Sequence, residues 1–329
     1  EALLGQCALA GACLLKPAPF SKTALSKLRG WRYAVTQLAH YRFHRFLSEH
    51  GYYEYRYRRK YGHPPNYANP RTLSEKLAWM RLYDRDPRYV QLVDKLAVRD
   101  WVRERVGEEV LVPLYGVWEK ASDIQLDELP ERFVLKCNHE CGYVVLCKDR
   151  DQLDWPFVQA QLATRLKMNY YYRYLEWPYL NVTPRILAEE LLENEQGGEP
   201  LDYKFYCFDG EPHYLYIVKD RHTKPIRAYF STDWEPMPFY SPEFMKGPLM
   251  PALPRPTQFE QMLNIARKLS QGLRYCRVDL YEVREQVFFG EITLICGAGF
   301  LTFTPDSYSY SLGDRIKLPE AATSQRLAR

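Results

Sequence analysis

The amino-acid sequence predicts an α+β fold in which helices come first and a body of antiparallel hairpins follows. A stretch from about residue 72 to residue 107 has helical periodicity. Asp209-Gly210, a strong hairpin signal, stands between two alternating apolar runs, and a second alternating pair, RYCRVDLYEV and QVFFGEITLI, lies near the C-terminal end. Hairpins join antiparallel strands, so this order does not fit a doubly wound parallel sheet.

The composition is that of an ordinary folded chain. Of 329 residues, 46% are hydrophobic and 26% are charged, which excludes a disordered chain and is enough for two or three subdomains. The net charge of +4 is too small to indicate nucleic-acid binding by itself. The eight cysteines are spread along the chain without a compact framework, so we expect mostly reduced thiols and a cytoplasmic protein.

Residues 20–60 and about 72–107 are predicted to be helical. Residues 20–60 are basic and aromatic, which fits either the solvated face of a packed helix or a surface that meets the inner face of a membrane. Thr72 and Glu75 have the spacing of a capping box. A second helix is expected to open at Pro87 and to close at Gly107, because proline suits a helix start and glycine a helix end.

The remaining segments alternate between strands and helices. Strands are predicted for VLVPLYGVW, FVLKC, YVVLCK, PRILAEELL, YKFYCF and the two hairpins. Helices are predicted for PFVQAQLATRLKMNYYYRYLE, for residues 257–273 and for the polar end that follows CGAGF.

The stretch FVLKCNHECGYVVLCKD has two interpretations. Cys137, His139, Cys141 and Cys147 are residue types that bind zinc, but no second ligand pair completes a tetrahedral site. A lysine at the end of a buried strand, followed by a glycine-containing turn, can instead hold a polyphosphate. We favour the phosphate-loop interpretation.

Two carboxylates in the last hairpin form a candidate metal site. Asp279 and Glu291 lie on neighbouring strands, with Arg277 on the face of Asp279 and Thr293 on the face of Glu291. Carboxylate and hydroxyl oxygens suit magnesium bound with phosphate, although exposed hairpin charges would give the same pattern. An unpaired charge at Glu291, inside an apolar run, would be costly, which favours the metal interpretation.

In this order the segments resemble the ATP-grasp ligases, and more closely the TupA-like (teichuronopeptide-biosynthesis-like) ATP-grasp family. The resemblance runs from about residue 70 to about residue 315 and includes NPRTLSEKLAWMRLYDRDPRYVQLVDKLAVRDWV, LPERFVLKCNH, RILAEELLE, DYKFYCFDGEP, RVDLYEV and GEIT. It implies that ATP and Mg²⁺ are held between two α+β subdomains. The corresponding division is an N-terminal segment 1–70, subdomains 71–182 and 183–315, and a tail 316–329.

The resemblance also assigns roles to residues. Lys95 and Lys136 correspond to the two nucleotide lysines, Gly142 to the phosphate loop, and Glu189 and Glu190 to the hinge that contacts adenine and ribose.

The acidic residues of the last hairpin and their basic neighbours receive the remaining roles. Asp279 and Glu291 correspond to the magnesium carboxylates, and Thr293 stands where many ATP-grasp enzymes have an asparagine ligand. Arg277 would face the acyl phosphate or the γ-phosphate, as a catalytic group alongside Lys136. Lys204 lies where the acceptor or its carboxylate would dock.

One residue of the loop departs from the family. The family reads KCNHGSG where this sequence reads KCNHECG, so Glu140 replaces a glycine. A carboxylate about 4 Å from a phosphate costs roughly 1 kcal/mol in water and roughly 4 kcal/mol at an effective dielectric of about 20. We expect Glu140 to point outward, to pair with Lys148 or Arg150, or to bind a magnesium ion.

The function implied by the resemblance is ATP-dependent formation of an amide from a carboxylate and an amine through an acyl phosphate. The expected product is an amino acid or amine joined to a uronic-acid-containing cell-envelope or capsular polysaccharide or its precursor. Two alternatives stay open. The tyrosines of NYYYRYLEWPY could stack on sugars in a glycosyltransferase-like enzyme, and Glu140 could mark a catalytically decayed ATP-grasp binding protein.

Overall fold

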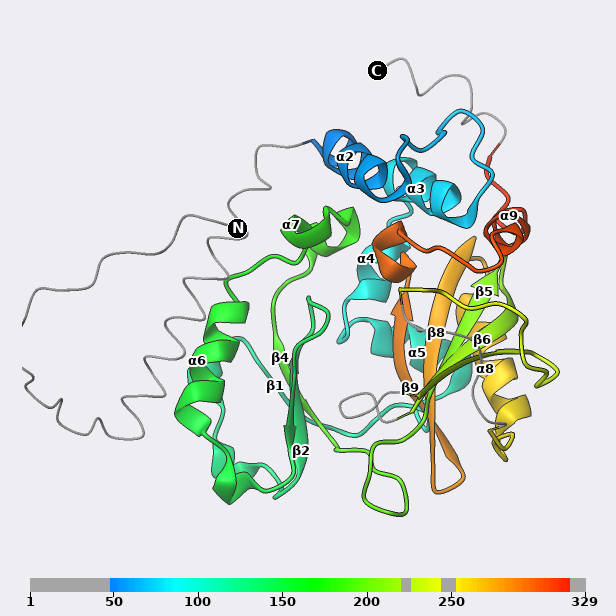
Figure 1. The fold of residues 1–329 in the computed structure, drawn as a ribbon. Coiled ribbons are helices and arrows are strands. Elements are labelled where there is room, and N and C mark those ends of the chain that lie inside the picture. Colours follow the sequence, from blue (N-terminus) through cyan, green and yellow to red (C-terminus); the bar gives the residue numbers. More distant parts are fainter. Residues whose placement is uncertain (1–47, 220–225, 244–252, 320–329) are drawn as a thin grey trace, which may run out of the picture.

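Two antiparallel sheets form the framework of the computed structural model, which describes residues 48–219, 226–243 and 253–319 (Figure 1). The four-stranded sheet has the order β1-β4-β2-β3, with β1 (Leu114–Trp118), β2 (Phe133–Cys137), β3 (Val144–Cys147) and β4 (Ile186–Glu189). The five-stranded sheet has the order β7-β6-β5-β8-β9, with β5 (Asp202–Phe208), β6 (Glu211–Lys219), β7 (Ile226–Ser231), β8 (Tyr275–Val283) and β9 (Gln286–Thr293). The predicted features of residues 1–47 and most of the predicted tail lie outside the described residues.

Helices surround these sheets. They are α2 (Glu49–Tyr61), α3 (Leu73–Tyr83), α4 (Arg88–Val93), α5 (Val98–Val106), α6 (Trp155–Arg165), α7 (Tyr171–Tyr174), α8 (Phe259–Ser270) and α9 (Ser307–Gly313). Single 3₁₀ turns are η2 (Ala121–Asp123), η3 (Leu126–Glu128), η4 (Arg150–Gln152), η5 (Trp177–Asn181) and η6 (Cys296–Gly299). The mixed helical and antiparallel content confirms the predicted α+β class, and no helix in the described part of the chain is both long and apolar enough to cross a bilayer.

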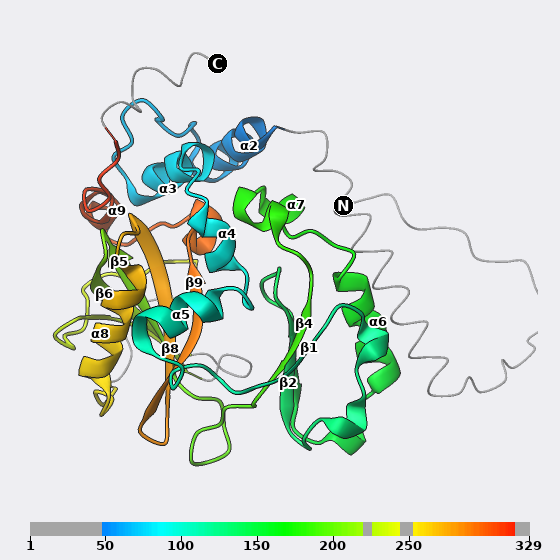
Figure 2. The same ribbon diagram turned by 180° about the vertical axis from the view of Figure 1, so that it is seen from behind.

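The four-stranded sheet is covered by α6 on the side away from the larger sheet (Figures 1 and 2). In β2 the alternate residues Phe133, Leu135 and Cys137 are buried in one apolar cluster with Val158 and Leu162 of α6. Since side chains alternate across a strand, Lys136 lies on the opposite face, which is turned toward the five-stranded sheet. The alternation of side chains along β2 therefore places Lys136 on the face of the sheet opposite α6.

The five-stranded sheet is buried on both faces. In β5, Phe205 and Cys207 pack with α5 and α8, while Tyr206 and Phe208 pack with α3 and α9. All residues of β5 are buried, as expected for a central strand covered on both sides. On the α3-side face, Lys204, Arg277 and Asp279 come together where β5 pairs with β8.

The hairpin and capping predictions are confirmed. Asp209 and Gly210, both with positive φ of 51° and 82°, connect β5 to β6. The Thr72 side chain accepts a hydrogen bond from the Glu75 amide, and the Glu75 carboxylate accepts one from the Thr72 amide at 3.0 Å. The described part of the basic aromatic segment forms α2, with its cations in the last turn.

The prediction of one helix from Pro87 to Gly107 is wrong, because the helix is interrupted between α4 and α5. Asp94 ends α4, and its Oδ1 accepts hydrogen bonds from the Leu96 amide at 2.8 Å and from the Asn138 side-chain amide at 2.8 Å. A contact with a loop distant in sequence thus outweighs local helical preference. The helix predicted for residues 156–176 is divided in the same way, into α6 and the single turn α7.

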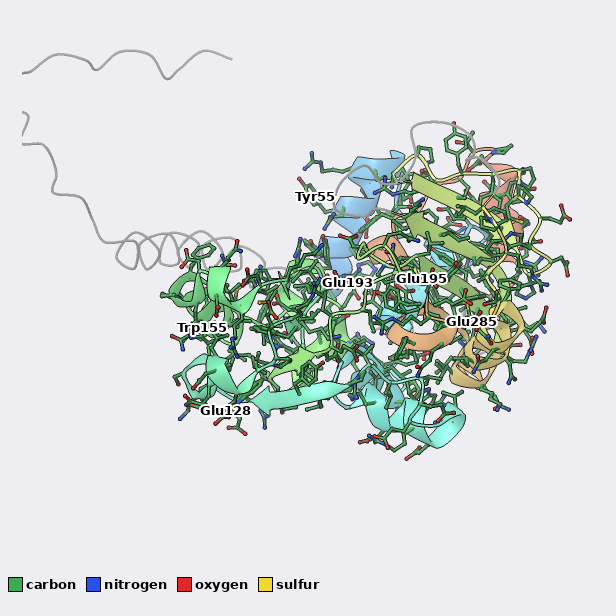
Figure 3. All side chains as sticks on the ribbon, turned by 90° about the horizontal axis from the view of Figure 1, so that it is seen from below. Tyr55, Glu128, Trp155, Glu193, Glu195 and Glu285 are labelled. Carbon is green, nitrogen blue, oxygen red and sulfur yellow. The ribbon has the colours of Figure 1, made fainter. Side chains whose placement is uncertain are left out.

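The segment after β4 passes from the four-stranded sheet toward the five-stranded one. Glu193 and Glu195 lie on this connecting segment (Figure 3). β4 pairs with β1 and β2 in the smaller sheet, although the predicted subdomain division falls before it, at residues 182 and 183. That division stays a prediction.

Candidate functional site

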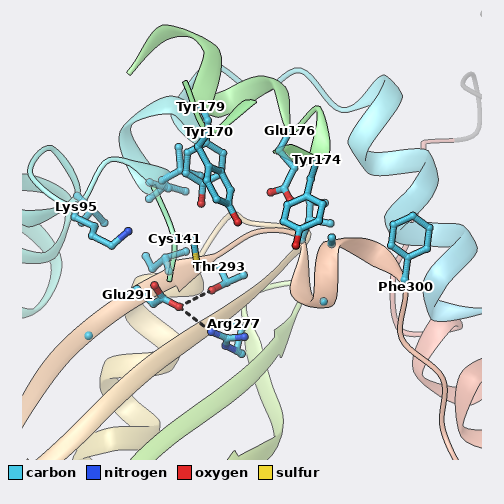
Figure 4. Close-up of a pocket in the computed structure, with 18 of the residues that line it drawn as sticks. Lys95, Cys141, Tyr170, Tyr174, Glu176, Tyr179, Arg277, Glu291, Thr293 and Phe300 are labelled. Atoms are coloured by element: carbon cyan, nitrogen blue, oxygen red, sulfur yellow. Dashed lines mark hydrogen bonds and ion pairs between the residues drawn. The ribbon is translucent and has the colours of Figure 1, made fainter. Parts of the chain in front are cut away.

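A cavity of about 500 Å³ opens above the polar face of the larger sheet (Figure 4). Five residues singled out from the sequence line it: Lys95, Cys141, Arg277, Glu291 and Thr293. Arg277, Glu291 and Thr293 rise from β8 and β9, whereas Lys95 reaches in from the α4–α5 connection. The structure therefore brings together groups that lie up to 198 positions apart (293 minus 95) in the sequence.

The interruption of the helix is what aims Lys95 at this cavity. Its backbone amide donates to the Asn138 carbonyl at 3.1 Å, and its ammonium donates to the Glu140 carbonyl. Asn138 is itself fixed by bonds to Asp94 and to the Thr183 carbonyl at 2.9 Å. The lysine and the loop after β2 thus form one hydrogen-bonded unit.

A charged network lies under the cavity on β5, β8 and β9. Register places Lys204 opposite Asp279, and Asp279 opposite Glu291. Arg277 Nη2 donates to Asp279 Oδ2 at 2.6 Å and to Glu291 Oε1 at 2.9 Å. Lys204 bonds the same Asp279 carboxylate and also Asp202, at 2.8 Å. Each cation of the network lies beside two carboxylates, so the opposite charges offset the cost of burying them together.

The predicted magnesium ligands fit a metal only in part. Asp279 has a side chain only 2% exposed, and Arg277 and Lys204 occupy both of its oxygens. Glu291 is 31% exposed and faces the cavity, with the Thr293 hydroxyl 3.3 Å from its Oε1. Across the described residues, no group of three or more His, Cys, Asp or Glu side chains is arranged to hold a metal ion. Glu291 and Thr293 offer hard oxygen ligands, whereas Asp279 does not in this arrangement.

Lys136 and Glu189 form an ion pair on the inner face of the smaller sheet. Their side chains are 17% and 7% exposed. Arg99 of α5 approaches the other Glu189 oxygen at 3.4 Å and donates to the Val112 carbonyl at 3.0 Å. Two cations around one buried carboxylate leave positive charge facing the space between the sheets, which is the charge that a polyphosphate requires.

Glu190 lies apart from the first cavity and lines a second one of about 620 Å³, together with Arg99, Arg103 and Phe288. Its amide donates to the Pro113 carbonyl at 3.0 Å. Phe288 also belongs to a small apolar cluster, Val112, Val283 and Phe288, against which Leu192 packs. An apolar wall beside a strand end suits a planar base, which agrees with the role expected for Glu190; that role, like the one expected for Glu189, stays a prediction.

The loop after β2 has the backbone that the sequence suggested, but its acidic residue behaves differently from expectation. Gly142 has a φ of +92° and open space around it, and Cys141 lines the first cavity. Glu140 is only 5% exposed and forms an ion pair with Arg165 of α6, whose guanidinium stacks 3.8 Å from the Tyr143 ring centroid. Burial raises the pKa of Glu140, and Arg165 opposes that shift.

Two of the three roles expected for Glu140 are therefore wrong, because the carboxylate is buried and its ion-pair partner is Arg165 rather than Lys148 or Arg150. The expected contact with a magnesium ion stays a prediction. Arg165 compensates the negative charge that Glu140 adds to this loop.

The zinc interpretation of this stretch receives no support from geometry. His139 Nε2 lies 3.1 Å from the Arg165 carbonyl and 3.0 Å from the Met168 carbonyl, so this nitrogen donates and is not free to bind a metal. Cys137 and Cys147 are buried, and the cysteines of the described residues are free thiols.

The other half of the cavity wall was not predicted from the sequence. It includes Arg56, Lys60, Tyr170, Tyr174, Glu176, Tyr179 and Glu243. The tyrosines come from the run NYYYRYLEWPY, which had been considered only for sugar stacking or packing. The signal was the proximity of aromatic and acidic residues in that run, but nothing local placed it opposite β9.

Comparison with known protein families shows what this chain is similar to. Residues 75–317 match the family model described as TupA-like ATPgrasp. No curated protein sequence matches the chain.

Similar solved structures include D-alanine–D-alanine ligase from Bacillus anthracis complexed with ATP, at 18% identity and a TM-score of 0.37, covering 69% of this chain and 63% of the other. The ATP-grasp ligase PsnB complexed with minimal precursor, Mg and ADP has 13% identity and a TM-score of 0.40, covering 77% and 67%. The L-amino acid ligase from Bacillus licheniformis has 14% identity and a TM-score of 0.42, covering 75% and 56%. The chain thus spans less than two thirds of the first and third of these proteins.

Proposed function

Because the chain belongs to the TupA-like ATP-grasp family, we propose that it is an ATP-dependent ligase that joins a carboxylate to an amine through an acyl phosphate. One observation carries the proposal. A single cavity has Lys95, Arg277 and Glu291 on one side and a wall with tyrosines and Glu176 on the other. Cations that neutralise a phosphoryl group thus face a pocket large enough for a second substrate.

Residues in different parts of the site would contact different parts of ATP. Lys136 and Arg99, on either side of Glu189, attract the phosphates between the sheets, and Glu190 marks the end that receives the base. Lys95 and Arg277 neutralise negative charge where the phosphoryl group is transferred. Positioning and charge compensation are the main contributions that a protein makes to this chemistry.

Magnesium bound with ATP would supply further charge neutralisation on the phosphates. Glu291 and Thr293 would hold it, because they face the cavity. Asp279 orients Arg277 and Lys204 in the structure, so its contribution is to fix these two cations.

The substrate we propose is a uronic-acid-containing cell-envelope or capsular polysaccharide, or its precursor, joined to an amine or amino acid. Its support is the resemblance to the teichuronopeptide-biosynthesis-like family. Contact with a membrane-associated assembly at the inner face of the membrane would involve the basic last turn of α2, which carries Arg58, Arg59 and Lys60.

A catalytically silent nucleotide-binding protein is the second candidate. The observation in its favour is that Arg277 and Lys204 already occupy Asp279. A silent protein would bind ATP without hydrolysing it, whereas a ligase would bind ATP and also convert it to ADP when the acid is present.

The test uses hydroxylamine, which traps an acyl phosphate as a hydroxamate without requiring the natural amine. The purified chain is incubated with ATP, Mg²⁺, hydroxylamine and a panel of uronic acids, and hydroxamate and ADP are measured. Formation of both, dependent on the acid and lost in Lys136→Ala, supports the ligase. Calorimetric ATP binding without any hydroxamate supports the silent protein, and absence of both contradicts each proposal.

A further inference from the structure

Glu176 is an acidic side chain in the cavity wall that the proposed ATP chemistry does not use. It lies between α7 and η5, and its carboxylate points into the cavity (Figure 4). Among the described residues, no partner lies within 4.0 Å of its carboxylate oxygens as an ion pair, and none forms a hydrogen bond with them. A partly buried carboxylate in such a position is stabilised by a positive partner or by a proton.

Aromatic rings line the same side of the cavity as this carboxylate (Figure 4). Tyr170, Tyr174 and Tyr179 line the same cavity, with ring centroids 4.7 Å apart for Tyr170 and Tyr179 and 6.0 Å apart for Tyr170 and Tyr174. The face of an aromatic ring attracts a cation, and a carboxylate beside several rings is a favourable site for an ammonium group.

Arg81 of α3 is the cation that lowers the pKa of Glu176, but it does not pair with this carboxylate. The Arg81 guanidinium donates to the Ala298 carbonyl at 3.1 Å and lies 4.8 Å from the Tyr53 ring centroid. Burial raises the pKa of Glu176, so this carboxylate accepts a proton more readily than an ordinary glutamate.

The opposite wall contains the groups proposed to hold the phosphoryl group. Arg277, Glu291 and Thr293 project from the strands below the tyrosines in the same cavity (Figure 4). A substrate nitrogen beside Glu176 would therefore face the acyl group across the cavity.

We propose that Glu176, with Tyr170, Tyr174 and Tyr179, binds the amine substrate as a primary ammonium ion and removes its proton before attack. The inference rests on the proposed ligase function and assigns its amine site. The class of substrate is a primary amine that is protonated at neutral pH.

The substrate nitrogen loses two protons as the amide forms. The ammonium gives one proton to Glu176, and the resulting amine attacks the acyl carbon. The new C–N bond forms as the C–O bond to phosphate breaks, and phosphate leaves with the electron pair. The second proton lost by nitrogen goes to the departing phosphate, which gives an amide, hydrogen phosphate and protonated Glu176.

The experiment compares two nucleophiles in wild type and in Glu176→Gln, using an acid that yields hydroxamate in wild type. Hydroxylamine is uncharged at neutral pH, whereas ammonium and ethanolamine must lose a proton first. We expect Glu176→Gln to lower kcat/KM for the two ammonium probes by about 100-fold, the usual size of a lost general base, and to change hydroxamate formation by less than about threefold.

Retained hydroxamate formation also shows that the variant is folded, so a selective loss has only one interpretation. Equal loss with both nucleophiles would assign Glu176 a structural role, as a counter-charge for Arg81, and would overturn the inference. No loss, or a wild type that uses hydroxylamine but neither ammonium probe, would overturn it as well. Absence of hydroxamate with every acid would instead remove the ligase function on which it rests.

Glu243→Gln is the matched control. Glu243 lines the same cavity, but its carboxylate is occupied by Lys60 and by the Ser241 and Thr302 hydroxyls, each at 2.5 Å. It has no free oxygen to receive a proton from an amine, so the ratio between the two nucleophiles should stay unchanged. If Glu243→Gln lowered activity with the ammonium probes but not with hydroxylamine, the proton acceptor would be Glu243 and not Glu176.

Discussion

Arg277 donates two hydrogen bonds to Asp279, from Nε to Oδ1 at 2.5 Å and from Nη2 to Oδ2 at 2.6 Å. Its Nη2 also reaches Glu291, so the guanidinium lies between the two carboxylates that the sequence assigned to magnesium. A monovalent cation built into the chain thus stands where a divalent cation was expected. Whether Arg277 excludes a metal or only shares its ligands can be measured directly.

Arg277→Gln should increase metal affinity and decrease turnover. Removing the guanidinium removes a positive charge next to Glu291, which we expect to tighten Mn²⁺ binding about tenfold, equivalent to about 1.4 kcal/mol. Acid-dependent ADP release should fall by about 100-fold or more, because a group stabilising the transferred phosphoryl is lost. Electron paramagnetic resonance of free Mn²⁺ measures the first effect, and Arg277→Lys is the control that retains the charge. Unchanged or weaker Mn²⁺ binding would show that the guanidinium does not compete with the ion.

Lys136→Ala should remove most of the stabilisation that ATP gives to the fold. A ligand at 100 times its Kd stabilises a protein by about 2.7 kcal/mol, and Lys136 supplies much of the charge that attracts the phosphates. The variant without ATP should lose about 1–3 kcal/mol, because Glu189 keeps only Arg99 as its partner. Urea unfolding with and without ATP measures both quantities. Lys148→Ala, which changes an exposed lysine beyond β3, should behave as wild type.

Glu291→Gln should separate binding from turnover. It keeps the side-chain volume but removes the charge that faces the cavity, so we expect ATP binding to change by less than about tenfold and ADP release to fall by about 100-fold or more. Calorimetry and the hydroxamate assay measure the two effects. Full turnover in this variant would remove Glu291 from the site.

Local sequence pattern was sufficient for the strands that build the site. Period-two alternation placed Arg277, Asp279, Glu291 and Thr293 on one face of a hairpin, and the register confirms their proximity. Alternation in β2 likewise separates Lys136 from the apolar residues beneath α6. These features depend on neighbours along one strand or across one turn.

The features that could not be predicted depend on partners distant in the sequence. The break before Lys95 is fixed by the bond between Asp94 and Asn138, 44 positions apart. Glu140 is neutralised by Arg165, 25 positions away on α6. Neither partner is indicated by any local periodicity, so both required the tertiary structure.

Glu140→Gly, the substitution that restores the family's loop sequence, should destabilise the protein without improving ATP binding. Arg165 would keep a buried charge without this partner, and breaking such a pair costs about 3–5 kcal/mol. The carboxylate that is removed was already turned toward α6, so little repulsion on phosphate is relieved. Urea unfolding and ATP titration measure the two effects, with Glu140→Gln as the control of equal size. A tenfold gain in ATP affinity would show that Glu140 does act against the nucleotide.

Acid should loosen the attachment of α2 to the rest of the molecule through Glu243. Burial alone would raise the pKa of Glu243, but hydrogen bonds from Lys60, Ser241 and Thr302 lower it to about 2. A carboxyl whose folded pKa lies below its unfolded value stabilises the fold fully above the unfolded pKa of 4.5, and this contribution is lost as the pH falls toward 2. Because Glu243 and Lys60 are both partly exposed, solvent screening limits the effect to about 1–2 kcal/mol.

The measurement that isolates this effect is the difference in unfolding free energy between wild type and Glu243→Gln, followed from about pH 6 to about pH 3. Other carboxylates titrate in the same range, but they contribute equally to both proteins and cancel in the difference. We expect wild type to be more stable at the upper end and the two curves to converge as the pH falls. Curves that stay parallel over this range would show that Glu243 is not held in its charged form by Lys60. The contact between α2 and residues 300–302 would then depend on two other hydrogen bonds. In these, Lys60 donates to the Phe300 carbonyl, and the Tyr61 hydroxyl donates to the Leu301 carbonyl at 3.0 Å.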